Sequence, residues 1–496
     1  MSNQSLLVST SSKTRRGLRF AIIGAGMAGV LTAVKLKEAG FSDFTVYEKN
    51  DHLGGTWWEN TYPGLSCDVP SHLYCYSFAL NPEWSHTFSP GAEIQSYFER
   101  VARDSEIIPF IHFGDEVMSC TFENGRWQLS TAGGHRDQVD VVIAATGVLH
   151  HPKYPDIKGL DSFGGALFHS ARWDHGVTLD GARVGIIGTG STSVQIVSAI
   201  VDRVEQLVLF QRTAQWVIPA MNPAYTPEEK AAFRQDPHLI EQLRAGVSQI
   251  YDGFSGAIVD AESPQMKTIE QACLTNLEDS VTDPELRELL RPDYRAACKR
   301  LIVSGDFYRA IQKPNATLVT DAIDSIEAGG VRTVVGHLHE LDVLVLATGF
   351  KVDAFVRPMS VVGRDDQSLE QAWSQRPEAY LSISVPGFPN FFMLNGPNGP
   401  VGNFSLVEVA ELQVGYILQL VERLRSGQCR EISATQAALD EFEVARVEAA
   451  KKTVWATGCR SWYLDDRGVP AAWPWHFDRF RSAMSAPAWE AYELRG

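Results

Sequence analysis

Two glycine-rich stretches of this 496-residue chain are each followed, at the same distance, by a charged residue. The first reads GAGMAG at residues 24–29, and Glu48 lies 24 residues after its first glycine. The second reads GTGSTS at residues 188–193, and Arg212 lies 24 residues after its first glycine. A carboxylate accepts hydrogen bonds from ribose hydroxyls and repels a 2′-phosphate, whereas a guanidinium binds that phosphate. The spacing therefore predicts two dinucleotide sites, FAD at the first and NADPH at the second. Two simpler readings stay open: an exposed acid at a strand end for Glu48, and an ordinary surface charge for Arg212.

Each glycine stretch lies between an apolar run of strand length and a segment with apolar residues at helical spacing. In such a loop the first glycine makes the turn, the second lets the backbone approach a pyrophosphate, and the third lets helix and strand pack closely. The third glycine of the second loop is Ser193, which is small enough to preserve that packing. The residues expected to bind cofactor here are Gly24, Gly26, Gly29, Glu48, Gly188, Thr189, Gly190, Ser191, Thr192, Ser193, Arg212 and Thr213.

The composition is that of an ordinary globular protein, with 44% hydrophobic and 21% charged residues. A formal net charge of −16 argues against a nucleic-acid surface. The seven cysteines are scattered and never form a CxxC pair, which speaks against a disulfide framework, a metal site and a redox-active cysteine pair. A cytoplasmic setting is the default expectation. The apolar run at residues 20–34 is too short to span a membrane, and residues 1–17 are expected to be a flexible tail.

Residues 163–174 fit the pattern FxGxxxHxxxW followed by Pro or Asp, with Phe163, Gly165, His169, Trp173 and Asp174 at the matching positions. This pattern is the fingerprint of flavin-dependent Baeyer–Villiger monooxygenases, and the chain resembles that family from about residue 20 to its C-terminal aromatic segment. The related heteroatom monooxygenases usually carry another aromatic residue at the end of the pattern. We interpret the stretch as a linker between the two nucleotide sites. An aromatic-rich connector without a functional role is the alternative.

Residues 54–64 read GGTWWENTYPG and lead to Asp68 and Tyr74. The segment is too rich in Gly, Trp and Pro for a regular element, and long loops in compact domains tend to be functional. It resembles the GGTW…YPG…D segment of the same family. The resemblance implies that this segment wraps the flavin and places an acid beside it. The residues then expected at the flavin are Gly55, Thr56, Trp57, Asp68 and Tyr74.

The remaining patterns suggest a domain order. Residues 223–293 are helical and charged, and the resemblance implies an insertion that helps to roof the substrate cavity. Small-residue turns at residues 145–147 and 347–349 suggest two chain crossings between nucleotide domains. We therefore expect an α/β fold with two Rossmann-like dinucleotide-binding domains. The FAD-binding domain would comprise residues 18–150 and 351–496, and the NADPH-binding domain residues 151–222 and 294–350, with the helical insertion at 223–293.

Residues 296–301, AACKRL, resemble the family's KR segment, which implies that Lys299 binds NADP and that Arg300 lies in the active site. The expected reaction is reduction of FAD by NADPH, followed by attack of a peroxyflavin on a ketone to give an ester or lactone. Arg300 stays protonated at working pH, so it would stabilise the negative charge on the reacting oxygens, with Asp68 as its partner. A structural ion pair is the alternative for these two residues.

The expected function is therefore that of an NADPH- and dioxygen-dependent Baeyer–Villiger monooxygenase acting on a small-molecule ketone, with sulfoxidation as a second activity. No nucleic-acid partner, membrane association or metal is expected. Two alternatives remain at this stage. One is a monooxygenase of sulfur or nitrogen atoms, and the other is a non-enzymatic flavoprotein that senses redox state. The aromatic C-terminal segment, residues 455–475, is expected to pack or to line the ketone pocket.

Overall fold

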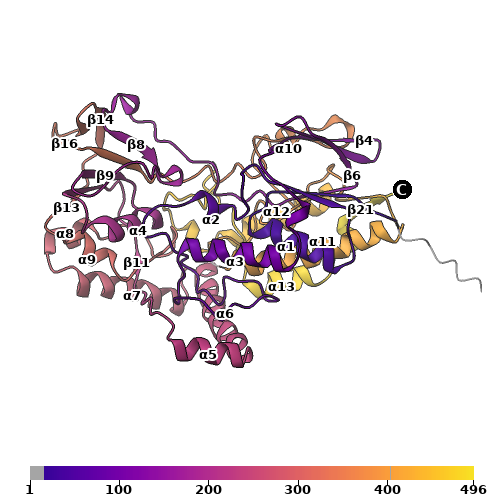
Figure 1. The fold of residues 1–496 in the computed structure, drawn as a ribbon, viewed down its shortest axis with the longest axis horizontal. Helices are drawn as coiled ribbons and strands as arrows, with labels where there is room; N and C mark the ends of the chain where they lie inside the picture. Colours follow the sequence, from indigo (N-terminus) through magenta and orange to yellow (C-terminus); the bar gives the residue numbers. More distant parts are fainter. Residues whose placement is uncertain (1–15, 403) are drawn as a thin grey trace, which may run out of the picture.

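A computed structural model describes residues 16–402 and 404–496. Figure 1 shows two lobes side by side, with a group of helices below them. The predicted flexible tail lies outside the described residues except for Arg16 and Gly17. The backbone N–H of Arg16 donates to the carbonyl of Arg425, and its guanidinium lies 3.0 Å from the Asp140 carboxylate.

The first lobe is built on a parallel five-stranded sheet with the order β19-β7-β1-β2-β3. Its central strands are apolar over their whole length and fully buried, as expected for a parallel sheet covered on both faces. Three helices, α1 (Met27–Glu38), α3 (Gly91–Asp104) and α11 (Leu406–Arg425), pack with one face of the sheet. The strands are β1 (Phe20–Ile23), β2 (Phe44–Tyr47), β3 (Ile111–His112), β7 (Val141–Ala144) and β19 (Phe391–Met393).

The other face of this sheet is covered by a second sheet, which has the order β18-β4-β5-β6. Alternate residues of β1, such as Ala21 and Ile23, pack there against Trp127 and Leu129 of the covering sheet. Its strands are β4 (Val117–Glu123), β5 (Arg126–Thr131), β6 (Arg136–Val139) and β18 (Ser360–Val362). The sequence patterns did not predict this layer.

The second lobe repeats the plan with a parallel sheet of order β13-β10-β9-β17-β8. Helices α4 (Ser191–Ile200) and α9 (Phe307–Ile311) pack on one face, and the antiparallel strands β14 to β16 pack on the other. The parallel strands are β8 (Ala166–His169), β9 (Arg183–Ile187), β10 (Gln206–Phe210), β13 (Ala316–Val319) and β17 (Val343–Leu346). The antiparallel strands are β14 (Ile323–Glu327), β15 (Gly330–Thr333) and β16 (Leu338–Glu340).

Strand β8 shows that part of the predicted linker, residues 163–174, is regular structure. Four of these residues form the edge strand of the second sheet, where His169 pairs with Leu346 of β17. The run ALFH is short and lies next to Gly164 and Gly165, so its strand character depends on the neighbouring strand rather than on a pattern of its own.

Four helices form a group that extends from residue 227 to residue 289; in Figure 1, α5 and α6 lie lowest, α7 runs along the lower side of the left lobe, and α8 lies at its left edge. Three of them begin with a side-chain cap followed by proline, at Thr226, Ser263 and Asp283. Just outside this group, β11 (Val217–Ile218) pairs with β12 (Ile302–Val303), so the chain leaves and returns at the same place. The helices are α5 (Pro227–Gln235), α6 (His238–Val259), α7 (Pro264–Ser280) and α8 (Pro284–Leu289).

The chain crosses between the lobes at two adjacent segments. Lys153 donates its backbone N–H to the Gly349 carbonyl, and Lys351 donates to the His151 carbonyl, at 2.8 and 2.9 Å. After the second crossing the chain returns to the first lobe. The remaining elements there are α10 (Leu369–Ala372), β20 (Glu431–Ala434), α12 (Gln436–Ala450), α13 (Phe477–Ser485) and β21 (Tyr492–Arg495). Within the described residues, no helix combines the length and apolar character that crossing a bilayer requires.

The structure contains one disulfide, between Cys298 and Cys459, whose Cα atoms lie 6.1 Å apart. The scattered cysteines spoke against any disulfide framework, so this crosslink corrects that expectation. The partners are 161 residues apart in the chain and meet only through the tertiary fold. The other five cysteines are free and buried.

Candidate active site

The first glycine loop joins β1 to α1 and has the close contacts that the pattern requires. A Cβ atom on Gly24 would lie 2.8 Å from the Ala145 carbonyl oxygen, and one on Gly29 would lie 1.8 Å from the Gly24 carbonyl oxygen. Gly26, the residue before helix α1, provides no side-chain cap. The first N–H groups of the helix are therefore available to an anion. This geometry fits a pyrophosphate at the helix N-terminus.

Glu48 lies at the end of β2 with 3% of its surface exposed, which excludes the reading as an exposed acid. Its two carboxylate oxygens accept from the backbone N–H groups of Ala25 and Asn50 at 2.7 and 2.9 Å. Burial raises the pKa of Glu48, and these hydrogen bonds offset part of the shift. Each oxygen keeps a second lone pair, so the carboxylate fits the hydroxyls of a ribose.

The segment at residues 54–64 packs directly on this loop. Gly54 donates its N–H to the Ala25 carbonyl, and a Cβ on Gly55 would lie 3.0 Å from the Cα of Gly26. The expectation of no regular element is wrong for residues 56–59, which form the short helix α2 (Thr56–Glu59). Its Trp57 donates an indole hydrogen bond of 3.2 Å to the Tyr74 hydroxyl. The predicted flavin-contacting residues thus lie around one loop, and they fit FAD.

The second glycine loop, between β9 and α4, has the same form. A Cβ on Gly188 would lie 2.4 Å from the Ala347 carbonyl oxygen, whereas one on Gly190 would meet open space. Helix α4 begins with Ser191 and Thr192. Gly190, the residue before it, provides no side-chain cap. Ser193 is fully buried, so serine does fit the packing position of the third glycine. The Thr189 hydroxyl donates to the Thr213 carbonyl at 2.9 Å, which joins the loop to the end of β10.

Arg212 and Lys299 come from distant parts of the chain, and the charge of Arg212 acts on Lys299. Burial and the Arg212 guanidinium lower the pKa of Lys299, and Asp293 offsets part of this shift. The Lys299 ammonium lies 4.5 Å from the centre of the Tyr294 ring. Two cations whose charges influence each other favour an anion between them, and they fit the 2′-phosphate of NADPH.

Arg300 and Asp68 form a bidentate ion pair between the flavin-side loop and the start of β12. The Arg300 Nη2 lies 2.7 and 2.6 Å from the two carboxylate oxygens, and the Nε lies 3.1 Å from Oδ2. The side chains are 31% and 19% exposed, so the pair is not sealed from solvent. The Asp68 carboxylate raises the pKa of Arg300, so its charge is permanent.

Three further residues surround this pair, and one of them, Tyr463, belongs to a segment that the sequence indicated. Arg300 Nη1 donates to the Gly402 carbonyl at 3.3 Å, and the Tyr251 hydroxyl donates to the Asp68 carbonyl at 3.2 Å. Tyr463 is 3% exposed, and its phenol has a pKa that burial raises and the Arg300 charge lowers. The aromatic density of the C-terminal segment pointed towards Tyr463. No pattern distinguishes Tyr251 from the other residues of α6.

The five fingerprint residues lie in and beside the edge strand of the second lobe. They are distant in sequence from both Arg300 and Asp68. Gly165 is required because a Cβ there would lie 2.2 Å from the Asp342 carbonyl oxygen, and Trp173 packs edge-on against Phe168. His169 is buried next to Phe350, which follows the second small-residue turn, and burial lowers its pKa. Phe163 packs in the second lobe, and Asp174 accepts from the Gly176 N–H at 2.8 Å. The motif therefore links the edge strand to the crossing segment.

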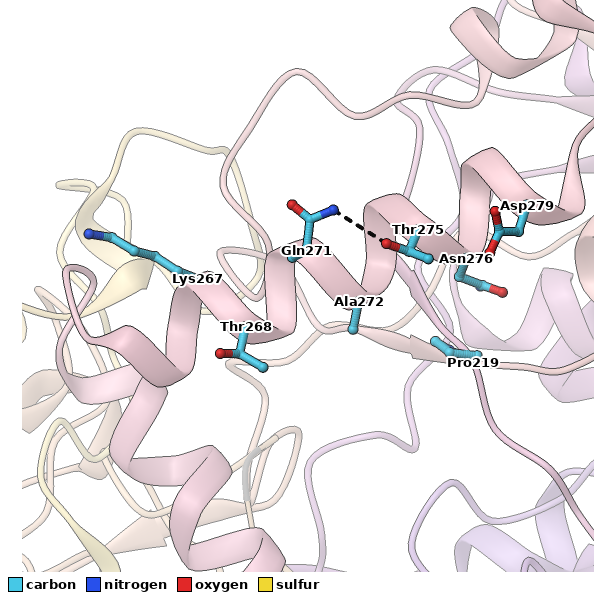
Figure 2. Close-up of a pocket in the computed structure, with 8 residues that line it drawn as sticks. All are labelled: Pro219, Lys267, Thr268, Gln271, Ala272, Thr275, Asn276 and Asp279. Carbon is cyan, nitrogen blue, oxygen red and sulfur yellow. Dashed lines mark hydrogen bonds between the residues drawn. The ribbon is translucent and has the colours of Figure 1, made fainter.

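A shallow groove of about 870 Å³ lies along α7, and Figure 2 shows the residues that line it. It is lined by Pro219 and by side chains of α7. Two of these side chains, Gln271 and Thr275, form a hydrogen bond with each other. None of the predicted site residues lines it. The groove is thus separate from the arrangement around Arg300.

Comparisons with known proteins show the family of this chain. The sequence profile of the family described as flavin-binding monooxygenase-like matches residues 17–249. A Baeyer–Villiger monooxygenase of Streptomyces coelicolor is 39% identical over 469 residues, which cover 94% of this chain and 90% of that protein. A second, from Pseudomonas aeruginosa, is 33% identical over 99% of this chain and 94% of its own length. The chain belongs to the flavin-dependent Baeyer–Villiger monooxygenases.

Solved structures of such monooxygenases have the same fold. Cyclohexanone monooxygenase from Rhodococcus sp. Phi1, bound to NADP⁺, superposes with a TM-score of 0.86 at 28% identity, covering 97% of this chain and 99% of that one. A steroid monooxygenase bound to NADP also gives 0.86, at 27% identity and 96% and 99% coverage. The family confirms the predicted two-domain α/β fold, the reaction class and the cofactors FAD and NADPH. The heteroatom alternative is not favoured.

Proposed function

We propose that this Baeyer–Villiger monooxygenase inserts one atom of dioxygen beside the carbonyl of a ketone, with Arg300 as its catalytic cation. The observation that carries the proposal is the bidentate Arg300 and Asp68 pair, partly exposed where the flavin-side loop meets the start of β12. Bound FAD, reduced by NADPH, supplies the activation of dioxygen. The remaining tasks fall to side chains of this chain.

Arg300 has the properties needed to hold negative charge on reacting oxygen. Its charge is permanent because Asp68 raises its pKa, and its planar fork offers several N–H donors. Asp68 occupies the Nε and Nη2 edge, whereas Nη1 donates a long hydrogen bond of 3.3 Å to the Gly402 carbonyl. That nitrogen is therefore the donor we assign to the reacting oxygen. Asp68 orients the guanidinium and balances its charge.

We assign cofactor binding to the two glycine loops. For FAD, the N-terminus of α1 would hold the pyrophosphate, Glu48 the ribose, and Trp57 and Tyr74 the flavin side. For NADPH, α4 would hold the pyrophosphate, and Arg212 with Lys299 the 2′-phosphate. The two domains would meet at the paired crossings near residues 151–153 and 349–351, which supports the domain bounds predicted from the sequence.

The proposed substrate is an apolar ketone. Tyr251 and Tyr463 lie around the ion pair and are mostly buried, so they would provide apolar walls for the substrate. Structural relatives include enzymes named for cyclohexanone and for steroids, both of which carry a carbon skeleton with few polar groups.

The test measures NADPH consumption by the FAD-loaded protein with a panel of ketones and sulfides, while mass spectrometry follows the products. Ketones should accelerate consumption and yield esters or lactones one oxygen heavier. Arg300→Ala should lower that rate by about 10²- to 10³-fold, as for other lost oxyanion donors. Arg309→Ala is the matched control, because Arg309 forms an exposed pair with Asp306 and should not affect the reaction. Full ketone oxygenation by Arg300→Ala would refute the role of Arg300.

A further inference from the structure

We propose that the Cys298–Cys459 disulfide positions Arg300 and Tyr463 for oxygen transfer by joining the Arg300 loop, residues 294–300, to the C-terminal segment, residues 453–463. Cys298 lies two residues before Arg300, and Cys459 lies four residues before Tyr463. The crosslink therefore ties together the two segments that meet at the site. The proposal rests on the proposed role of Arg300.

The Arg300 loop has no helix or strand of its own. It is attached to its own lobe by the Trp216 indole, which donates to the Tyr294 carbonyl at 2.7 Å, and by the Ile302 N–H, which donates to the Trp216 carbonyl. Within it, Ala297 has a φ of +61°, a left-handed conformation that costs free energy for any residue except glycine. Such a conformation persists only where the surroundings impose it, and the crosslink is at the next residue.

The C-terminal segment reaches the same place from the first lobe. Trp455 is 1% exposed, and its ring centre lies 5.0 Å from that of Tyr463. A Cβ on Gly402 would lie 1.9 Å from the Tyr463 hydroxyl, so the phenol lies against the backbone whose carbonyl accepts from Arg300. Residues 457–471 also contain no helix or strand.

These contacts surround Arg300. Asp68 holds one side of the guanidinium, and Gly402 with Tyr463 lies on the other. Of these contacts, only the disulfide joins the Arg300 loop to the C-terminal segment covalently. The Arg300 loop is irregular, and the C-terminal segment is irregular after its short 3-10 helix, Val454–Ala456, so we infer that the separation between Arg300 and Tyr463 depends on that bond. When the bond is open, the wall formed by Tyr463 can move away from Arg300, and oxygen transfer loses its fixed geometry.

The bond can be opened chemically. A dithiol such as dithiothreitol supplies two electrons and two protons. The S–S bond then breaks, two cysteine thiols form, and the dithiol closes to a cyclic disulfide. Titration of the denatured protein should give five thiols before reduction and seven after it, because five of the seven cysteines are free. Seven thiols before reduction would overturn the proposal.

The functional test compares Cys459→Ala with Cys273→Ala in the FAD-loaded full chain. Cys273 is a free, buried cysteine in the same hydrophobic cluster, so it is matched in burial and location. The readout is the amount of ketone product formed per NADPH consumed, with flavin content measured in parallel. Cys459→Ala should lower this ratio by about 3- to 100-fold, since a small misplacement of a reacting group has effects up to that size. Its flavin content should stay unchanged, and Cys273→Ala should keep the wild-type ratio.

Reduction of the wild-type protein provides a second route if Cys459→Ala does not fold. Dithiothreitol should lower the ratio in the wild type and in Cys273→Ala alike, with flavin still bound. An unchanged ratio in protein that titrates seven thiols would overturn the positioning role. If Arg300→Ala also retains activity, the proposed function has failed. If Arg300→Ala is inactive while the opened bond has no effect, only the disulfide proposal has failed.

Discussion

Replacing Asp68 with asparagine tests how Arg300 is held. Three N–H···O contacts join the two side chains, at 2.6, 2.7 and 3.1 Å. Asparagine has almost the same shape but offers one acceptor oxygen, and its amide donors face the guanidinium donors. At least one charge-assisted hydrogen bond is lost, which is worth about 1.5–3 kcal/mol. Because the side chains are 31% and 19% exposed, water screens part of this.

We therefore expect the lower part of that range, about 1.5–2 kcal/mol, or roughly 10- to 30-fold in kcat/KM for ketone oxygenation. The assay is steady-state product formation by Asp68→Asn, measured with and without a second change, Arg300→Lys. Lysine cannot form the bidentate contact, so Asp68→Asn should cost less than about threefold in that background. Asp306→Asn, at an exposed ion pair, is the control and should have no effect. An equal loss in both backgrounds would show that Asp68 acts independently of Arg300.

Arg212→Ala should raise KM for NADPH by about 10- to 100-fold and leave that for NADH unchanged, because only NADPH carries the 2′-phosphate; equal changes with both cofactors would contradict this. His72 is buried, and burial lowers its pKa to about 4, from 6.5. The unfolded chain therefore binds a proton that the folded one does not, so the unfolding free energy should fall by up to about 3 kcal/mol between pH 6.5 and 4. In denaturant titrations, the unfolding free energy of His72→Gln should fall less over this pH range than that of the wild type. An equal fall in both proteins would refute the role of His72. Gly29→Ala should abolish flavin binding and lower stability by about 1–3 kcal/mol through overpacking. Gly246→Ala, on α6 with open space at its Cβ, should raise stability by about 0.5–1 kcal/mol in the same melts; similar effects of both changes would exclude the steric explanation.

Much of the fold near the nucleotide loops could be predicted from sequence. Strands β1 and β9 and helices α1 and α4 lie where the segments beside the two glycine loops predict them, and Glu48 and Arg212 follow strands β2 and β10. The helices after the glycine loops begin about three residues earlier than expected, at Met27 and Ser191, because the loop itself makes the first helical turn. The covering strands β4 to β6 and β14 to β16 were not predicted. Strand β5 alternates strictly between buried and partly exposed residues, whereas the burial of β4 and β14 does not alternate regularly, and neither group of strands lies beside a glycine loop that would mark it.

The sequence by itself determined the two nucleotide loops, since the glycines and the residue 24 positions later belong to one strand–helix–strand unit. Steric limits on such a turn act over a few residues, so they leave a pattern in a short window. The Arg300 and Asp68 pair was expected only from the family resemblance, because the residues are 232 positions apart. Only the tertiary structure decided the Cys298–Cys459 crosslink and the places of Tyr251 and Tyr463. These contacts join segments from different lobes, and their formation depends on how whole elements pack, which no local pattern records.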